Sequence, residues 1–136
     1  MTTALRRRGF TLVELMVACV IVVLLAATAV PSMRGDALRA ARSDGVQALT
    51  RLQAAQERYR TAHGLYAVDL GTLGGVALVS EQGRYALHVE NTGPESYTAT
   101  ALARGAQARD TACLALTLEV HQGFARPGPN PQCWNR

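Results

Sequence analysis

Hydrophobic residues are distributed unevenly along the chain, and the longest apolar run defines its first element. From Phe10 to Val30 the sequence reads FTLVELMVACVIVVLLAATAV, in which Glu14 is the single charged residue. A run of about 20 apolar residues, at about 1.5 Å of helix rise each, spans the hydrocarbon core of a bilayer. The pattern therefore predicts a membrane-spanning helix over residues 10–30.

A second helical pattern follows Pro31. Polar residues, Arg42 and Asp44 among them, fall between apolar positions, which predicts an amphipathic helix with one buried face. We expect Gly64 to end this helix and Pro31 and Gly35 to weaken or kink its junction with the first. The apolar positions recur at spacings near three and four, with one wider gap: Leu38, Ala41, Val46, Leu49, Leu52, Ala55 and Tyr59.

The second half of the chain is patterned for strands. Residues 64–83 are rich in glycine and lack a strong period, which predicts a connecting loop. Alternating positions predict three antiparallel strands over residues 84–90, 96–103 and 112–120, with a turn at residues 91–94. The tail, GFARPGPNPQCWNR, holds three prolines and is expected to have little regular structure. The sequence thus predicts an α+β fold with a small antiparallel sheet packed on a long N-terminal helix.

The net charge of +4 comes largely from the start of the chain. Arg6, Arg7 and Arg8 precede the apolar run, and without them 11 basic side chains face 10 acidic ones. Positive charge beside a membrane helix stays in the cytoplasm. We therefore expect a cytoplasmic N-terminus and export of everything after Val30.

Three kinds of export segment fit this arrangement. An ordinary signal peptide would be cut near Ala27–Ala29, and a lipoprotein signal would end at Cys19. In the third, cleavage between Gly9 and Phe10 retains the helix. Glu14 favours the third, because a carboxylate in a membrane helix costs up to about 3 kcal/mol and a disposable signal has no use for it. Cleavage there creates an amine on Phe10, one helical turn from the Glu14 carboxylate, and the two charges can neutralise each other.

The segment RRRGFTLVELMVACVIVVLLAATAVP resembles the class III signal of type IV prepilins. In that pattern a short basic leader ends in glycine, phenylalanine follows, and glutamate stands at the fifth mature position; Gly9, Phe10 and Glu14 match it. The resemblance implies that a prepilin peptidase cuts after Gly9 and methylates the amine of Phe10. It also implies that Glu14 guides the subunit into a filament, and Pro31 matches a proline that many such helices carry.

The resemblance also implies how the chain is organised and where it acts. Residues 1–9 form a cleavable leader, 10–33 the transmembrane and assembly half of the helix, and 34–136 a periplasmic or extracellular head. The partners are the prepilin peptidase, the inner membrane before assembly and other pilins, major and minor, through the N-terminal helix. No cofactor is implied.

Three cysteines are present: Cys19, Cys113 and Cys133. Cys19 is interpreted as a small apolar residue of the helix. Cys113 and Cys133 can pair, and a disulfide between them would imply an oxidising compartment outside the cytoplasm. The arrangement DTACLALTLEVHQG…CW resembles the disulfide-bounded C-terminal loop of PilE-like and related type IVa minor pilins, which implies a disulfide between Cys113, expected on the third strand, and Cys133.

Binding to DNA is a further hypothesis. Arg104, Arg109, Arg126 and Arg136 lie in the second half of the head and contact phosphates if they converge. Trp134 is a candidate to stack on exposed bases. The alternative is that these arginines are solvated and that Trp134 packs under the disulfide loop.

We therefore expect a type IV pilus subunit, foremost a minor pilin for pilus assembly in motility, adhesion or DNA uptake. The alternatives within this class are a major pilin, a DNA-receptor pilin and a secretion-system pseudopilin. From another class, a conventionally secreted binding protein stays open. No catalytic motif and no zinc-ligand spacing occurs in the sequence, so neither an enzyme nor a metal site is expected.

Overall fold

The computed structural model describes residues 10–135, except for the side chains of residues 30–32. Contacts within the chain separate two compact units, Met1–Arg34 and Gly35–Arg136. We call the second unit the head. The predicted three-part organisation stays a prediction, because the leader lies outside the described residues.

A single helix, α1 (Leu12–His63), contains both predicted helical stretches. The helix is not interrupted at Pro31 or at Gly35. It ends where the sequence indicates: Gly64 has a left-handed φ of +78° and its N–H donates to the Arg60 carbonyl at 2.7 Å. A glycine in this conformation is the usual end of an α-helix, because it carries no Cβ that would clash.

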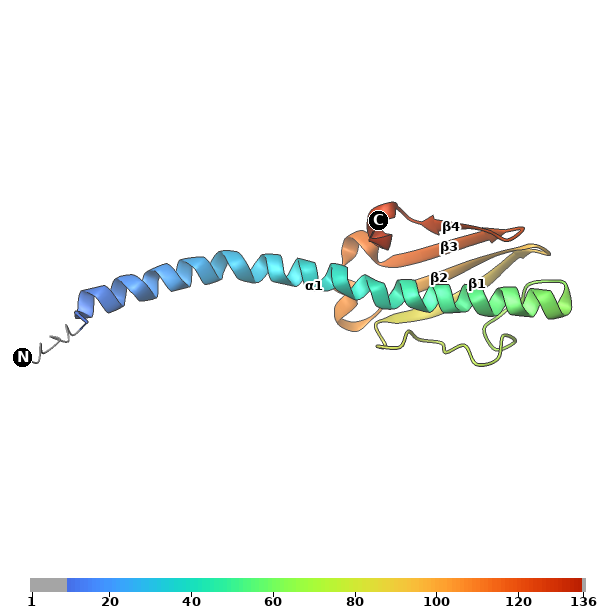
Figure 1. Cartoon of the computed structure of the whole chain (residues 1–136), viewed down its shortest axis with the longest axis horizontal. Coiled ribbons are helices and arrows are strands. Elements are labelled where there is room, and N and C mark those ends of the chain that lie inside the picture. Colours follow the sequence, from blue (N-terminus) through green and yellow to red (C-terminus); the bar gives the residue numbers. More distant parts are fainter. Residues whose placement is uncertain (1–9, 136) are drawn as a thin grey trace, which may run out of the picture. The chain divides into compact units, whose positions relative to one another are not determined.

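In the head, the second half of α1 lies along a four-stranded antiparallel sheet with strand order β1-β2-β3-β4 (Figure 1). The strands are β1 (Tyr85–Gly93), β2 (Ser96–Ala103), β3 (Ala115–His121) and β4 (Phe124–Gly128). Three short 3₁₀ helices complete the head: η1 (Gly105–Arg109), η2 (Thr111–Cys113) and η3 (Pro131–Trp134). The α+β fold of a long helix on a small antiparallel sheet is thereby confirmed.

The sheet corrects the predictions in three places. The turn predicted at residues 91–94 is present but lies at residues 94–95, because β1 continues to Gly93 with a register shift after Asn91. Cys113 belongs to η2, because β3 begins only at Ala115. The tail, expected to be irregular, contains β4, which pairs with β3 from Phe124 to Gly128. β4 is an edge strand, and there a proline such as Pro127 is tolerated.

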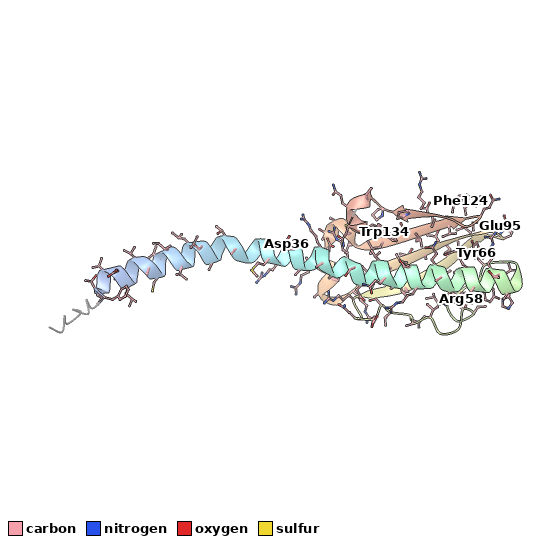
Figure 2. The ribbon with its side chains drawn as sticks, viewed as in Figure 1. Asp36, Arg58, Tyr66, Glu95, Phe124 and Trp134 are labelled. Atoms are coloured by element: carbon pink, nitrogen blue, oxygen red, sulfur yellow. A yellow bond between two sulfur atoms is a disulfide. The ribbon has the colours of Figure 1, made fainter. Side chains whose placement is uncertain are left out.

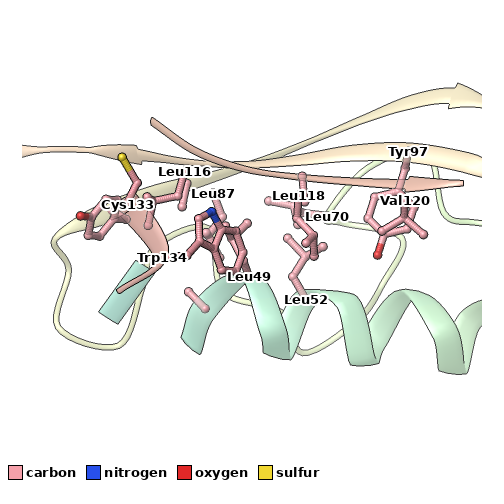
Figure 3. Close-up of a cluster of buried hydrophobic side chains, with 14 of the residues drawn as sticks. Leu49, Leu52, Leu70, Leu87, Tyr97, Leu116, Leu118, Val120, Cys133 and Trp134 are labelled. Carbon is pink, nitrogen blue, oxygen red and sulfur yellow. The ribbon is translucent and has the colours of Figure 1, made fainter. Parts of the chain in front are cut away.

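The core lies between α1 and the inner face of the sheet, as Figure 3 shows for its labelled side chains. Tyr97, Ala99 and Ala101 alternate inward on β2, as the pattern predicts, and are all fully buried. Gly45 of α1 lets the helix approach the sheet closely: a Cβ added there would lie 2.9 Å from Leu116 Cδ1 and 3.0 Å from Tyr85 Cδ2. Gly45 falls in the wider gap of the helical pattern, so the gap marks close packing.

Two buried tyrosine hydroxyls, those of Tyr85 and Tyr97, have no hydrogen-bond partner among the described residues. The ring of Tyr97 meets that of Tyr66 edge-on at 4.8 Å between centroids. Burial, together with the nearby Glu57 charge, raises the pKa of Tyr97 well above its ordinary value.

Candidate functional site

The start of α1 is formed by a helix-capping motif of neighbouring residues. The Glu14 N–H donates to Thr11 Oγ1 at 3.3 Å, and the Leu15 N–H donates to the Thr11 carbonyl at 3.1 Å. Thr11 is therefore the N-cap, and Thr-x-x-Glu is the sequence of a capping box. The sequence reasoning missed this signal, which gives Glu14 a favourable position beside the positive end of the helix dipole.

The first unit is an apolar helical surface. Its large hydrophobic side chains between Phe10 and Leu25 are all more than half exposed, and an 18-residue window in α1 has a mean hydropathy of 2.7 with none of it buried in the chain. By length and composition this helix can cross a membrane. An exposed apolar surface of this extent marks a segment that lipid or other protein covers.

The predicted processing and assembly residues are only partly described. Phe10 is 80% exposed and directly precedes the Thr11 cap. Glu14 is exposed in the first turn. Gly9 and the side chain of Pro31 lie outside the described residues. The roles assigned to these four residues stay predictions.

The C-terminal tail is fastened at the end of the head where α1 enters it. A disulfide joins Cys113 to Cys133, with the Cα atoms 5.5 Å apart, and both residues are buried. The Asn130 side chain caps η3 by accepting from the Cys133 N–H at 3.1 Å. The indole N–H of Trp134 donates to the Gly128 carbonyl at 2.7 Å. The expected disulfide-closed C-terminal loop is present, and β4 and η3 give it regular structure.

A buried ion pair ties α1 to this loop. Arg42 donates to Asp110 through Nε at 2.6 Å and through Nη2 at 2.8 Å, and through Nη1 to the Gln132 carbonyl at 3.0 Å. Gln107 of η1 donates to the Leu38 carbonyl at 3.1 Å. The hydrogen bonds to Asp110 raise the pKa of the Arg42 guanidinium, against the opposing effect of desolvation. These polar contacts join α1 to η1, to Asp110 after η1, and to η3.

Asp44 connects α1 to the segment that precedes β1. It accepts from the hydroxyl of Ser80 and, at 3.1 Å, from the Gln82 N–H. The Ser80 hydroxyl in turn accepts from the Tyr85 N–H at 3.0 Å. Arg42 and Asp44 are therefore buried, and their assignment to a polar face between the apolar positions is wrong. Periodicity missed them because their partners lie far away in sequence.

The predicted DNA contacts that the structure describes do not form one patch. Arg126 on β4 lies opposite Glu119 of β3, which lies opposite Thr98 of β2. Arg104 follows the other end of β2, about 20 Å along the strand at about 3.3 Å per residue. Arg109 ends η1, and Arg104 is the N-cap of the same short helix. Arg104, Arg109 and Arg126 are all exposed.

Trp134 is a correction to the same prediction. It is 8% exposed, hydrogen-bonded to Gly128 and part of the hydrophobic core, so stacking on bases is excluded in this structure. Figure 2 shows it at the opposite end of the head from Phe124, an aromatic side chain that is 82% exposed. Arg136 lies outside the described residues. Among the predicted DNA contacts that the structure describes, Arg104 and Arg109 stand at the two ends of η1.

Comparison with known proteins finds matches over residues 5–117. Residues 31–117 match the family described as "Type IV minor pilin ComP, DNA uptake sequence receptor". Residues 5–30 match the prokaryotic N-terminal methylation motif. A curated relative, the "Type IV major pilin protein PilE" of Neisseria gonorrhoeae, is 32% identical over 84 residues, which are 62% of this chain. The matched stretch spans half the length of that relative.

Proposed function

We propose that this chain, which belongs to the type IV minor pilin family ComP, is a minor pilin that takes part in DNA uptake. The observation that carries the proposal is the unbroken succession of matches: the methylation motif ends at residue 30 and the minor-pilin family begins at residue 31. An assembly segment and a minor-pilin head thus follow each other in one chain.

The proposal begins with membrane anchoring and processing. The chain is inserted in the inner membrane with a cytoplasmic N-terminus, a prepilin peptidase cuts after Gly9, and the amine of Phe10 is methylated. The match of residues 5–30 to the methylation motif supports this step. So does the exposed position of Phe10, which directly precedes the Thr11 cap and leaves the new amine outside the helix.

Assembly follows from the uncovered apolar surface of the first unit. A lipid bilayer covers it before assembly, and the equivalent helices of other pilins cover it in the filament. Glu14 is the one carboxylate within this surface among the described residues, so it favours a position where a cation meets it. The amine of Phe10, in the same chain or in a neighbour, is that cation in the proposal.

Glu14 has two proposed effects: its carboxylate pairs with the Phe10 amine during assembly, and it contributes to the cap of α1. A pair of variants separates these effects. Glu14→Ala removes the carboxylate, whereas Thr11→Ala removes the N-cap and keeps the carboxylate. We expect Glu14→Ala to insert into the membrane normally but to be depleted from sheared filaments, and Thr11→Ala to be incorporated. Equal depletion of both variants would assign Glu14 to helix capping alone.

The DNA-uptake role is tested in the native cell by deletion and complementation. We expect deletion to abolish uptake of labelled DNA, and the wild-type chain to restore it. The variant Arg104→Gln/Arg109→Gln tests whether these two arginines contact DNA: if both bind phosphate, their loss lowers the salt slope of DNA binding by about 2, and an unchanged slope excludes them as DNA contacts. The control Arg58→Gln/Arg126→Gln removes the same charge from exposed side chains elsewhere on the head. Normal uptake in the deletion strain would refute the proposed role.

A second candidate function is that of a major filament subunit. The similarity to the gonococcal major pilin favours it. Abundance decides between the two, because a major subunit dominates a sheared filament and a minor pilin is a trace component of it.

A further inference from the structure

A cluster of arginines surrounds the end of the head where α1 enters. Arg104 and Arg84 face each other where β2 ends and β1 begins, with the Arg104 N–H donating to the Arg84 carbonyl at 2.9 Å. Arg109 ends η1, and Gln107 of η1 donates to the carbonyl of Leu38, the residue before Arg39. We call Arg39, Arg84, Arg104 and Arg109 the basic collar.

The collar carries uncompensated charge. All of its side chains are exposed, and among the described residues none of them forms an ion pair. Carboxylates at this end already have partners: Asp110 pairs with Arg42, Asp44 accepts from Ser80, and Glu81 pairs with Arg51. Among the described residues, Asp36 is the one nearby carboxylate that is exposed without an ion pair.

The rest of the head shows the opposite balance. Glu95 lies at the far end of the head, beside Phe124 in Figure 2. Glu90 and Glu119 flank Thr98 on the outer face of the sheet. Because 10 arginines and 9 acidic residues lie between residues 35 and 136, the head is nearly neutral as a whole. Outside the four collar arginines, six arginines and nine acidic residues remain in the head, so its excess of positive charge lies at the collar.

We propose that the basic collar binds the headgroups of anionic phospholipids while the subunit is anchored in the membrane, before it enters a filament. The inference rests on the proposed function, in which the apolar segment spans the inner membrane. Arg39 lies five residues after Arg34, the last residue of the first unit, so the collar belongs to the part of the head that follows the membrane segment directly in sequence. Guanidinium groups bind phosphate by paired hydrogen bonds.

The position of the collar favours lipid over DNA as the source of phosphate. The collar includes Arg39, five residues after the first unit ends, and η1, which contacts the Leu38 carbonyl through Gln107. Clusters of basic residues next to a membrane helix are attracted to anionic lipids. Binding would hold the head against the bilayer and would end when the subunit is extracted into a filament.

Fluorescence quenching on the full processed chain in nanodiscs tests this inference. In a Cys19→Ala background, an environment-sensitive dye is attached to Ala106→Cys, an exposed position in η1, or to Ala62→Cys, near the far end of α1. Nanodiscs contain phosphatidylcholine alone or mixed with phosphatidylglycerol, plus a lipid with a nitroxide on its headgroup. The native disulfide is buried and does not react with the dye.

The inference predicts strong quenching at position 106 only in discs that contain phosphatidylglycerol, reversed by added salt, and weak quenching at position 62 throughout. Each arginine near the surface is expected to change the ratio of docked to undocked heads roughly fivefold. The variant Arg104→Gln/Arg109→Gln therefore lowers this ratio about 25-fold, and the control Arg58→Gln/Arg126→Gln lowers it less than about twofold because those side chains lie away from the membrane surface.

Two results would overturn the inference. Equal quenching at position 106 in both kinds of disc would show that lipid charge is not recognised. If quenching at position 106 is equal in both kinds of disc and the variant Arg104→Gln/Arg109→Gln also loses binding to duplex DNA, these arginines are assigned to DNA instead. Failure of the proposed function is distinguishable, because it appears as absence of the wild-type chain from filaments and not in the nanodisc assay.

Discussion

The buried pair Arg42–Asp110 gives the sharpest prediction about stability. The side chains of Arg42 and Asp110 are 8% and 6% exposed. In Arg42→Met the aliphatic part of the side chain is kept, but Asp110 loses both guanidinium hydrogen bonds and retains the one from Gln107 Nε2 at 3.3 Å. Because an unpaired buried charge remains, we expect a cost of about 3–5 kcal/mol. That is a large part of the roughly 5–15 kcal/mol that stabilises a typical domain.

The assay uses Trp134, the only tryptophan of the chain, as a reporter of the head. Because Trp134 is buried in the core, its fluorescence follows head unfolding in urea while the membrane segment stays in a detergent micelle. The double variant Arg42→Met/Asp110→Leu removes both charges, and it should recover most of the lost stability. A cost below about 1 kcal/mol for Arg42→Met would contradict the reasoning, because that magnitude is typical of solvent-exposed pairs.

Three further predictions use the same fluorescence assay. Reducing the disulfide should lower the stability of the head by about 3 kcal/mol, because its loop of 20 residues is no longer closed in the unfolded chain; an unchanged unfolding midpoint would count against this. Gly45→Ala should destabilise the head by about 1–3 kcal/mol through overpacking, whereas Gly35→Ala, with open space around its Cβ, should leave the midpoint unchanged or higher; the reverse order would refute the close packing. Because the pKa of Tyr97 is raised in the folded state, stability should be full below about pH 10 and fall as the pH rises further; Tyr97→Phe should weaken this alkaline loss, and an unaltered pH profile would exclude Tyr97 as its source.

The sequence predicted best those features that are determined by residues close together in the chain. The apolar run, the basic leader and the spacing of Phe10 and Glu14 predicted the family to which the chain belongs, because a membrane helix is specified by its own residues. β2 was predicted at its observed bounds, since small and aromatic residues alternate there with polar ones. Gly64 ends α1 because that position requires a positive φ.

Long-range pairing escaped prediction. Arg42 was interpreted as solvated because Asp110 lies 68 residues away, and nothing in the helical period indicates such a partner. β4 was missed because its proline suggested irregular chain, whereas an edge strand needs only one side of its backbone to pair. Trp134 was offered as a DNA contact because a single chain does not reveal which aromatic side chain fills the core. Likewise, nothing in the sequence indicated that the Phe124 side chain is exposed whereas that of Trp134 is buried.

The central claim, that this chain is a processed minor subunit of a type IV filament, is tested most directly on the filaments themselves. Filaments sheared from the native cell are digested, and the peptides of this chain, including the N-terminal one, are quantified by mass spectrometry. The account predicts a methylated N-terminus at Phe10 and trace abundance relative to the main subunit. A mature N-terminus near Val30, or absence of the chain from filaments, would contradict it.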